Sequence, residues 1–197
     1  MGQRDAEIQD LIDCLAVAVH GPGQPALPTG ADISRLFERL QSCCKPCLEG
    51  AGNDLPILSL LPVAVKTAQA GSGPAAAVAR AFATLAPRLR WYVRAEQNLV
   101  EFTNGHANAE IIGTRGLEAR DDITIGVSLL APNVQYPEHR HPPEEVYIVL
   151  SEGEWCQNNG PWQAPGIGGL VYNPSNTLHA MRASSAPLLA LWCLWPK

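Results

Sequence analysis

The stretch YPEHRHPPEEVY, at residues 136–147, carries an unusual density of polar donor side chains. Its twelve residues include two of the five histidines, three glutamates and two of the four tyrosines, and an apolar run follows them. Three prolines stiffen the segment and restrict where these side chains point. Burying so many polar groups beside apolar residues is unfavourable unless each group has a partner. A metal ion is the simplest partner for all of them.

The spacing of the donors predicts that they converge on one site. His139 and His141 are two residues apart, as are Glu145 and Tyr147, so each pair shares one face of a strand. His179 arrives from a later apolar segment, after a Pro-Ser-Asn turn. Two imidazole nitrogens and a carboxylate, with room for water, describe an open metal site that suits Zn²⁺, Fe²⁺ or Mn²⁺. The alternative is a polar loop beside a hydrogen-bonded core histidine.

The chain divides into a helical part and a strand-rich part. Apolar residues recur at helical spacing in the first part, with Gly- and Pro-rich breaks between the segments. Short runs that alternate β-branched and polar residues follow, with hairpin signals at 104–105 and 158–160. The expected helices are 5–20, 33–44, 56–69, 74–85 and 87–93. The expected strands are 99–103, 109–114, 123–130, 145–150, 154–157, 161–163, 170–173, 178–182 and 188–195.

Close spacing of the strands favours an antiparallel barrel or jelly roll. We therefore predict an α+β protein, in which a helical segment (1–96) packs as one compact unit on a β-barrel (97–197) that carries the metal site. A length of 197 residues is compatible with this organisation.

Charge and hydropathy restrict the partners. A net charge of −5 with 14 basic residues argues against a nucleic-acid surface. No apolar run reaches the roughly 18–20 residues of a membrane-spanning helix, and the N-terminus lacks the pattern of a secretory signal. We expect a cytoplasmic protein that acts on a small molecule, with no nucleic-acid or membrane partner, as a monomer or homodimer.

The six cysteines do not form the framework of a small disulfide-rich domain. Cys44 and Cys47 make a CxxC, but no second Cys or His pair at zinc-site spacing accompanies it. The segment before it looks helical, whereas a redox CxxC follows a strand. We expect a structural role and a reducing compartment.

Two motifs resemble those of the cupin superfamily. The segment HRHPPEE at 139–145, followed by Gly153, resembles the first cupin motif. Gly168, followed by PSNTLH at 174–179, resembles the second. The resemblance implies a jelly-roll fold with a metal ion inside it.

The match has three departures. The spacing from Glu145 to Gly153 is one residue longer than usual, Asn176 replaces a glycine, and Ala183 replaces an asparagine. Because asparagine tolerates positive φ, we expect the turn at Asn176 to be retained.

A closer resemblance is to the cupin-type lyases of dimethylsulfoniopropionate (DMSP), especially the short Q-type subgroup, which also has helices ahead of the cupin. The matching pattern is Y-x-x-H-x-H-x-x-x-E-x-Y at 136–147, with His179 beyond it. The tyrosine two residues after the glutamate is the discriminating feature. The resemblance implies one divalent Zn, Fe or Mn ion, with roles as follows: metal ligands His141, Glu145 and His179; base Tyr147; pocket residues Tyr136 and His139. Spacing alone leaves His139 open as a fourth ligand.

The implied reaction is a β-elimination that yields acrylate and dimethyl sulfide. The proton leaves a carbon beside a carboxylate, so a cation must stabilise the developing charge. A cation also favours the phenolate form of a tyrosine, whose pKa is normally near 10. Aromatic faces suit the sulfonium group. The candidates are Tyr136, Trp155, Trp162, Tyr172, Trp192 and Trp195.

Two other functions fit the same motifs. One is another cupin metalloenzyme, such as an Fe(II) dioxygenase or an isomerase. The other is a non-catalytic cupin that binds a small ligand. The first predicts that substitution of His139 abolishes activity while Tyr147 is dispensable. The second predicts tight ligand binding with no turnover under any metal.

Overall fold

A computed structural model describes residues 4–21, 33–42, 55–94 and 99–196 of the chain. Several sequence-based expectations fall outside these residues. They are the CxxC at 44–47, the continuation of the second helix to residue 44, the Gly/Pro-rich loop after Gly21, and the proposed boundary between residues 96 and 97.

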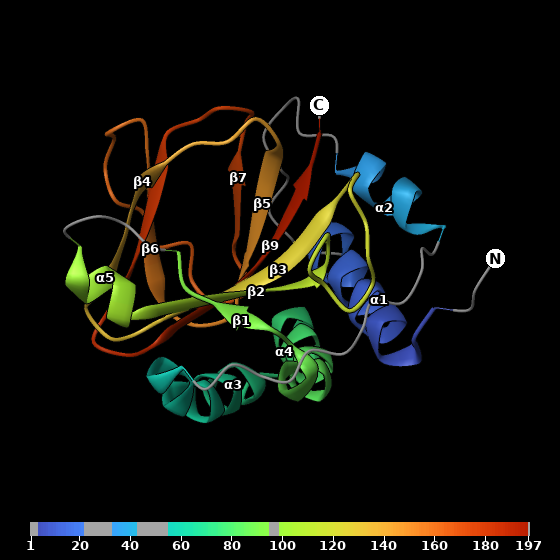
Figure 1. The fold of residues 1–197 in the computed structure, drawn as a ribbon, viewed down its shortest axis with the longest axis horizontal. Helices are drawn as coiled ribbons and strands as arrows, with labels where there is room; N and C mark the ends of the chain where they lie inside the picture. The colour runs from blue at the N-terminus through green and yellow to red at the C-terminus, as the bar shows by residue number, and fades with distance from the viewer. Residues whose placement is uncertain (1–3, 22–32, 43–54, 95–98, 197) are drawn as a thin grey trace.

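The helices of the N-terminal part follow the predicted order (Figure 1). They are α1 (Ala6–His20), α2 (Ser34–Leu40), the 3-10 helix η1 (Pro56–Leu60), α3 (Leu61–Gln69) and α4 (Pro74–Leu85). Asp5 caps α1 by accepting a hydrogen bond from the Glu7 amide at 2.9 Å. The predicted helix at 56–69 is divided into η1 and α3, and Pro62 stands in the first turn of α3. Within the described residues, no helix combines the length and apolar character needed to cross a membrane.

In the described part of the chain, nine strands form two antiparallel sheets, which confirm the predicted jelly roll (Figure 1). The larger sheet has the order β1-β2-β3-β9-β5-β7, and the smaller has the order β4-β8-β6. The strands are β1 (Trp91–Tyr92), β2 (His106–Ile112), β3 (Thr124–Leu130), β4 (Gln135–His139), β5 (Glu144–Val149), β6 (Gly153–Gln157), β7 (Leu170–Asn173), β8 (His179–Ala183) and β9 (Leu188–Trp195).

The larger sheet is buried on both faces. Alternate residues such as Ile125, Val127 and Leu129 join the helices in one apolar core. Their neighbours on the opposite face, such as Leu130 and Trp192, join the smaller sheet in a second core. A strand covered on both faces reads as a continuous apolar run, which explains the LLALWCLW sequence of β9. The helical segment thus packs on the β-sandwich, as predicted.

The prediction of a helix over residues 87–93 was wrong. A 3-10 helix, η2 (Ala86–Arg88), ends the helical part, and β1 then pairs with β2 through the register Trp91↔Ala109. Trp and Tyr favour strands, and this pairing buries Trp91 completely.

The prediction of a strand over residues 99–103 was also wrong. These residues fall largely in the short helix α5 (Val100–Asn104), and Gly105 is its C-cap rather than part of a hairpin turn. A glycine after a short apolar run signals a helix end as well as a turn, and so few residues leave the periodicity ambiguous. The strand that follows begins at His106, earlier than predicted.

The second hairpin signal was correct. Asn158 and Asn159 adopt positive φ values of 49° and 56° in the turn after β6. The returning segment makes only a single bridge, Trp155↔Gln163, instead of the predicted strand at 161–163.

Core packing between α1 and α4 should support the whole fold. Leu15 is fully buried in the helical core, whereas Val17 in the same helix is 56% exposed. We expect Leu15→Ala to lower the free energy of unfolding by about 2–5 kcal/mol, measured by urea denaturation. Val17→Ala is the matched control and should change it by no more than about 0.5 kcal/mol. Equal effects of the two substitutions would contradict this packing.

Candidate metal centre

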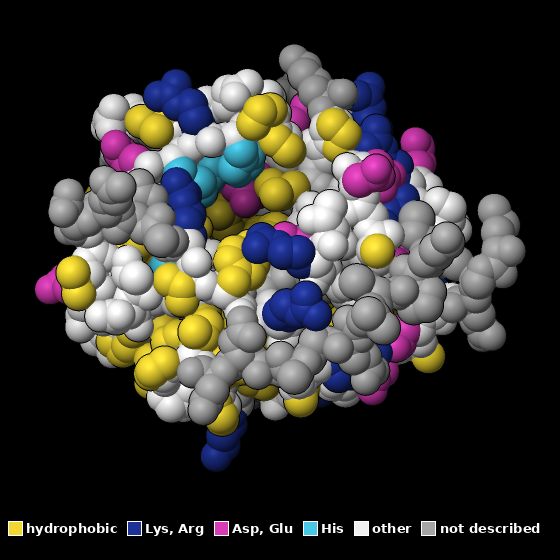
Figure 2. Space-filling model, viewed as in Figure 1, with side chains coloured by type: hydrophobic (Ala, Val, Ile, Leu, Met, Phe, Trp, Pro, Cys, Tyr) yellow, Lys and Arg dark blue, Asp and Glu magenta, His cyan; other side chains and the backbone are white. Residues whose placement is uncertain are grey.

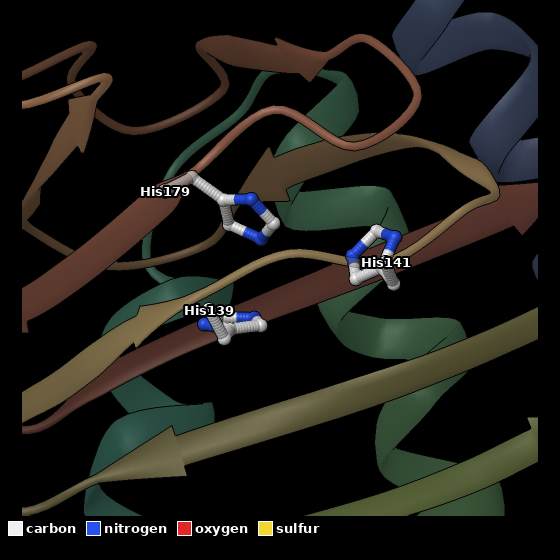
Figure 3. Close-up of side chains that lie close together, drawn as sticks. All are labelled: His139, His141 and His179. Carbon is white, nitrogen blue, oxygen red and sulfur yellow. The ribbon is translucent and has the colours of Figure 1, made fainter.

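Three histidines gather at one end of the smaller sheet (Figure 3). His139 ends β4, His179 begins β8 directly opposite it, and His141 lies just beyond the end of β4. One ring nitrogen from each lies within 4.8 Å of the others. The predicted turn at Asn176 is confirmed, with φ of 59°, and its amide donates to the His141 carbonyl at 2.9 Å. This bond holds the His141 loop against the start of β8.

Backbone carbonyls fix the orientation of all three imidazoles. The Nδ1 atoms of His139, His141 and His179 lie 3.0, 3.0 and 2.8 Å from the carbonyl oxygens of Pro137, Pro143 and Thr177, respectively. Because a carbonyl only accepts hydrogen bonds, each Nδ1 carries a proton, and in the neutral ring each Nε2 presents a lone pair. This arrangement is typical of metal-binding histidines.

Glu145 on β5 faces two of these lone pairs. Its Oε2 atom lies 3.5 Å from His141 Nε2 and 3.2 Å from His179 Nε2. Both nitrogens are buried and have no hydrogen-bond partner among the described residues. Such atoms repel the carboxylate unless a proton or a cation lies between them.

A second layer of side chains holds Glu145 in place. Asn173 Nδ2 donates to Glu145 Oε2 at 2.8 Å, and Gln157 Nε2 donates to Asn173 Oδ1 at 2.6 Å. Sequence reasoning missed Asn173 and Gln157, because neither belongs to the motifs.

The charges of the cluster fit a divalent cation. Burial raises the pKa of Glu145, but the adjacent His141 and His179 outweigh it and hold this pKa at about 2. Burial, with His179 beside it, lowers the pKa of His139 to about 4. Burial also acts to lower the pKa of His141, but Glu145 raises it above its usual value. A charged carboxylate among imidazole lone pairs is a ligand set that suits Zn²⁺, Fe²⁺ or Mn²⁺.

The two motif tyrosines lie in the same cavity, of about 180 Å³, together with His139, His141 and Glu145. Tyr147 is buried in this cavity, and burial followed by the Glu145 charge raises its pKa well above 10. Burial likewise raises the pKa of Tyr136, despite nearby Arg94 and Asn108. Figure 2 shows histidines and an acidic side chain in a hollow, with basic side chains at its rim.

The structure thus brings together every residue that the sequence predicted for the site. It also separates their neighbours. Glu138 and Arg140 are exposed. Glu144 points away from the cavity, but it is buried and accepts a hydrogen bond from the Tyr172 hydroxyl at 2.9 Å.

Two polar cavity residues from the larger sheet were missed. Asn108 and Ser128 line the cavity from β2 and β3, beside Trp192 of β9, which was one of the aromatic candidates. A signal existed in the sequence, because polar residues alternate with apolar ones through HANAE at 106–110. Such alternation marks the face of a strand that does not join an apolar core.

Some of the aromatic candidates for a sulfonium receptor line the cavity, and others lie outside it. Tyr136 and Trp192 line the cavity. Trp155 packs against Tyr147, with 5.9 Å between ring centroids. The other three lie elsewhere: Trp162 beneath the Arg182 guanidinium, and Tyr172 stacked on Trp195 on the helix-facing side.

Two facing antiparallel sheets around a histidine-lined cavity define the protein as a cupin. A family model described as dimethylsulfoniopropionate lyase matches residues 30–190, which is most of the chain. The protein therefore belongs to the DMSP lyase family.

Individual relatives agree with this family. DMSP lyase DddQ of Ruegeria pomeroyi is 36% identical over 86 residues, which are 43% of this chain and 42% of that protein. DddL of Cereibacter sphaeroides, provisionally described as a DMSP lyase, is 31% identical over 124 residues, 62% of this chain and 52% of that protein. The match spans about half the length of these curated relatives or less.

Solved structures share the fold over nearly the whole chain. The crystal structure of DddQ from Ruegeria pomeroyi has a TM-score of 0.71 and 23% identity, covering 98% of this chain and 93% of that one. A structure from a study of the DMSP lyases RdDddP and RnDddQII has a TM-score of 0.69 and 22% identity, covering 96% and 92%. These similarities extend to the N-terminal helices.

Removal of one imidazole should abolish metal binding. We expect protein reconstituted with Zn²⁺ to hold one ion per chain, and His179→Ala to lose it, because the remaining ligands are too few. The measurement is metal content by mass spectrometry after gel filtration. His20→Ala, at the C-terminal end of α1, is the control and should keep the ion. Full zinc content in the His179 variant would contradict the assignment.

Proposed function

We propose that this protein cleaves DMSP by β-elimination to acrylate and dimethyl sulfide, with the help of one divalent metal ion. The observation that carries the proposal is the buried Glu145 carboxylate, which faces two unpartnered Nε2 atoms and shares one cavity with Tyr147. Membership of the DMSP lyase family supports the choice of substrate.

We assign His141, Glu145 and His179 as the residues that hold the ion, which would be Zn²⁺, Fe²⁺ or Mn²⁺. Glu145 makes its close contacts with these two histidines. His139 lies beside them, with its ring 4.2 Å from that of His179 and 4.9 Å from that of Tyr136, and is assigned to the pocket. When bound, the ion supplies positive charge for the substrate carboxylate and the enediolate that develops from it.

Tyr147 is the proposed base. It lies two residues after Glu145 on β5, so its side chain points into the same cavity. Burial and the Glu145 charge keep its phenol protonated, and compensation of that charge would favour the phenolate. The phenolate then accepts the proton from the carbon beside the carboxylate. The electrons of that C–H bond form the double bond of acrylate, while those of the C–S bond leave with neutral dimethyl sulfide.

The cavity also suits the rest of the substrate. A volume of about 180 Å³ accommodates a molecule of few heavy atoms. Trp192 and Tyr136 contribute aromatic groups to its wall, and an aromatic face attracts the sulfonium cation by about 0.5–2 kcal/mol.

The direct test is a headspace assay for dimethyl sulfide. Protein stripped of metal and reconstituted in turn with Zn²⁺, Mn²⁺ and Fe²⁺ is incubated with DMSP. We expect release of dimethyl sulfide and equimolar acrylate with at least one of these ions, and none from the stripped protein. Stoichiometric binding of each ion without any dimethyl sulfide would overturn the proposed reaction.

A second prediction tests the base. We expect Tyr147→Phe to lower kcat by roughly 10²–10⁴-fold, because the proton acceptor is lost, while zinc content stays at one ion per chain. The matched control is Tyr172→Phe, since Tyr172 lies on β7 of the same sheet but hydrogen bonds to Glu144 outside the cavity. Steady-state kinetics with both variants decide the point, and near wild-type kcat in Tyr147→Phe would exclude this residue as the base.

A further inference from the structure

A chain of hydrogen bonds crosses the floor of the cavity and ends on Tyr136. Trp192 Nε1 donates to Ser128 Oγ at 3.1 Å, Ser128 Oγ donates to Asn108 Oδ1 at 2.7 Å, and Asn108 Nδ2 donates to the Tyr136 hydroxyl at 3.3 Å. All four side chains are buried and line the cavity. This hydrogen-bond chain includes neither the proposed base nor the proposed metal ligands.

The donor and acceptor groups of these side chains determine the direction of each hydrogen bond. An indole N–H only donates, so Ser128 must accept at its near end. The 2.7 Å separation between Ser128 and Asn108 is the usual length of an O–H···O bond, which places the amide oxygen toward Ser128 and the amide nitrogen toward Tyr136. The Arg94 guanidinium lies over the Tyr136 ring, 5.8 Å from its centroid.

The hydroxyl oxygen of Tyr136 therefore accepts from Asn108, and its own proton points away from this donor. Neighbouring rings hold the phenol in place. Phe102 lies edge-on with a centroid distance of 4.7 Å, His106 lies at 5.4 Å, and His139 at 4.9 Å. With the ring fixed and the oxygen occupied, the O–H is directed at an acceptor in the cavity.

The sheet is built to accommodate this chain. Asn108 and Ser128 are direct partners across β2 and β3. A Cβ atom at Gly126 would lie 2.3 Å from Trp192 Cζ2, so the glycine makes room for the indole. Uncharged polar groups in a buried sheet are unfavourable unless they are hydrogen bonded, and apolar residues would fill the same positions without this cost.

We propose that Trp192, Ser128 and Asn108 are positioning residues that fix Tyr136 as a hydrogen-bond donor to the carboxylate of the ligand. The identity of that ligand as DMSP rests on the proposed function. The hydrogen-bond relay from Trp192 through Ser128 and Asn108 to Tyr136 itself requires only a small carboxylate ligand. It gives the two cavity tyrosines opposite roles, because Tyr136 donates a hydrogen bond and Tyr147 accepts a proton.

The test measures binding of acrylate to the zinc-reconstituted protein by isothermal titration calorimetry. We expect Tyr136→Phe to weaken acrylate binding roughly tenfold or more, since a hydrogen bond to a charged group is lost. Ser128→Ala should weaken it about three- to tenfold through the loss of the relay. The double variant should bind no more weakly than Tyr136→Phe alone, because Ser128 acts only through that hydroxyl.

A matched control is Ser151→Ala. Ser151 is as buried as Ser128, but it bonds to the backbone of Pro187 and Leu189 outside the cavity, so its loss should leave acrylate affinity unchanged. Additive effects of Ser128→Ala and Tyr136→Phe would show that Ser128 is merely structural and would overturn the relay. The relay would also be overturned if the wild-type protein did not bind acrylate, or if Tyr136→Phe bound acrylate with unchanged affinity. If acrylate binding behaves as expected but DMSP is not cleaved, the relay stands and the proposed reaction fails.

Discussion

The site depends on one electrostatic conflict, between the Glu145 carboxylate and the lone pairs of His141 and His179. Backbone carbonyls hold each Nδ1 proton, so in the neutral rings the Nε2 lone pairs face the carboxylate at 3.5 and 3.2 Å. Three electron-rich atoms this close, in a buried setting, are stable only with positive charge between them. The same charge would lower the barrier to deprotonation of Tyr147, which shares the cavity.

The architecture supplies this arrangement by burying the larger sheet on both faces. Helices cover one face, so the opposite face is left to line a cavity with the smaller sheet. Strands β4 and β8 bring His139 and His179 into register, and β5 places Glu145 and Tyr147 opposite them. Rigid strands carry most of the site, while the His141 loop is fixed by its bond from Asn176.

The sequence was most informative where side-chain periodicity meets a motif. Two-residue spacing placed Glu145 and Tyr147 on one face, and asparagine chemistry at 176 predicted its positive φ. It was least informative for short elements such as α5 and β1, because propensity over so few residues is outweighed by pairing and packing. Asn108, Ser128 and Asn173 escaped prediction because their role depends on partners far away along the chain.

The central claim is that a cation lies among His141, Glu145 and His179. Anomalous diffraction at the zinc edge, from crystals of the zinc-loaded protein, locates the ion directly. The account predicts the strongest anomalous peak about 2.0–2.2 Å from the Nε2 atoms of His141 and His179 and from a carboxylate oxygen of Glu145. A zinc peak elsewhere in the protein, with these three side chains unliganded, would contradict it.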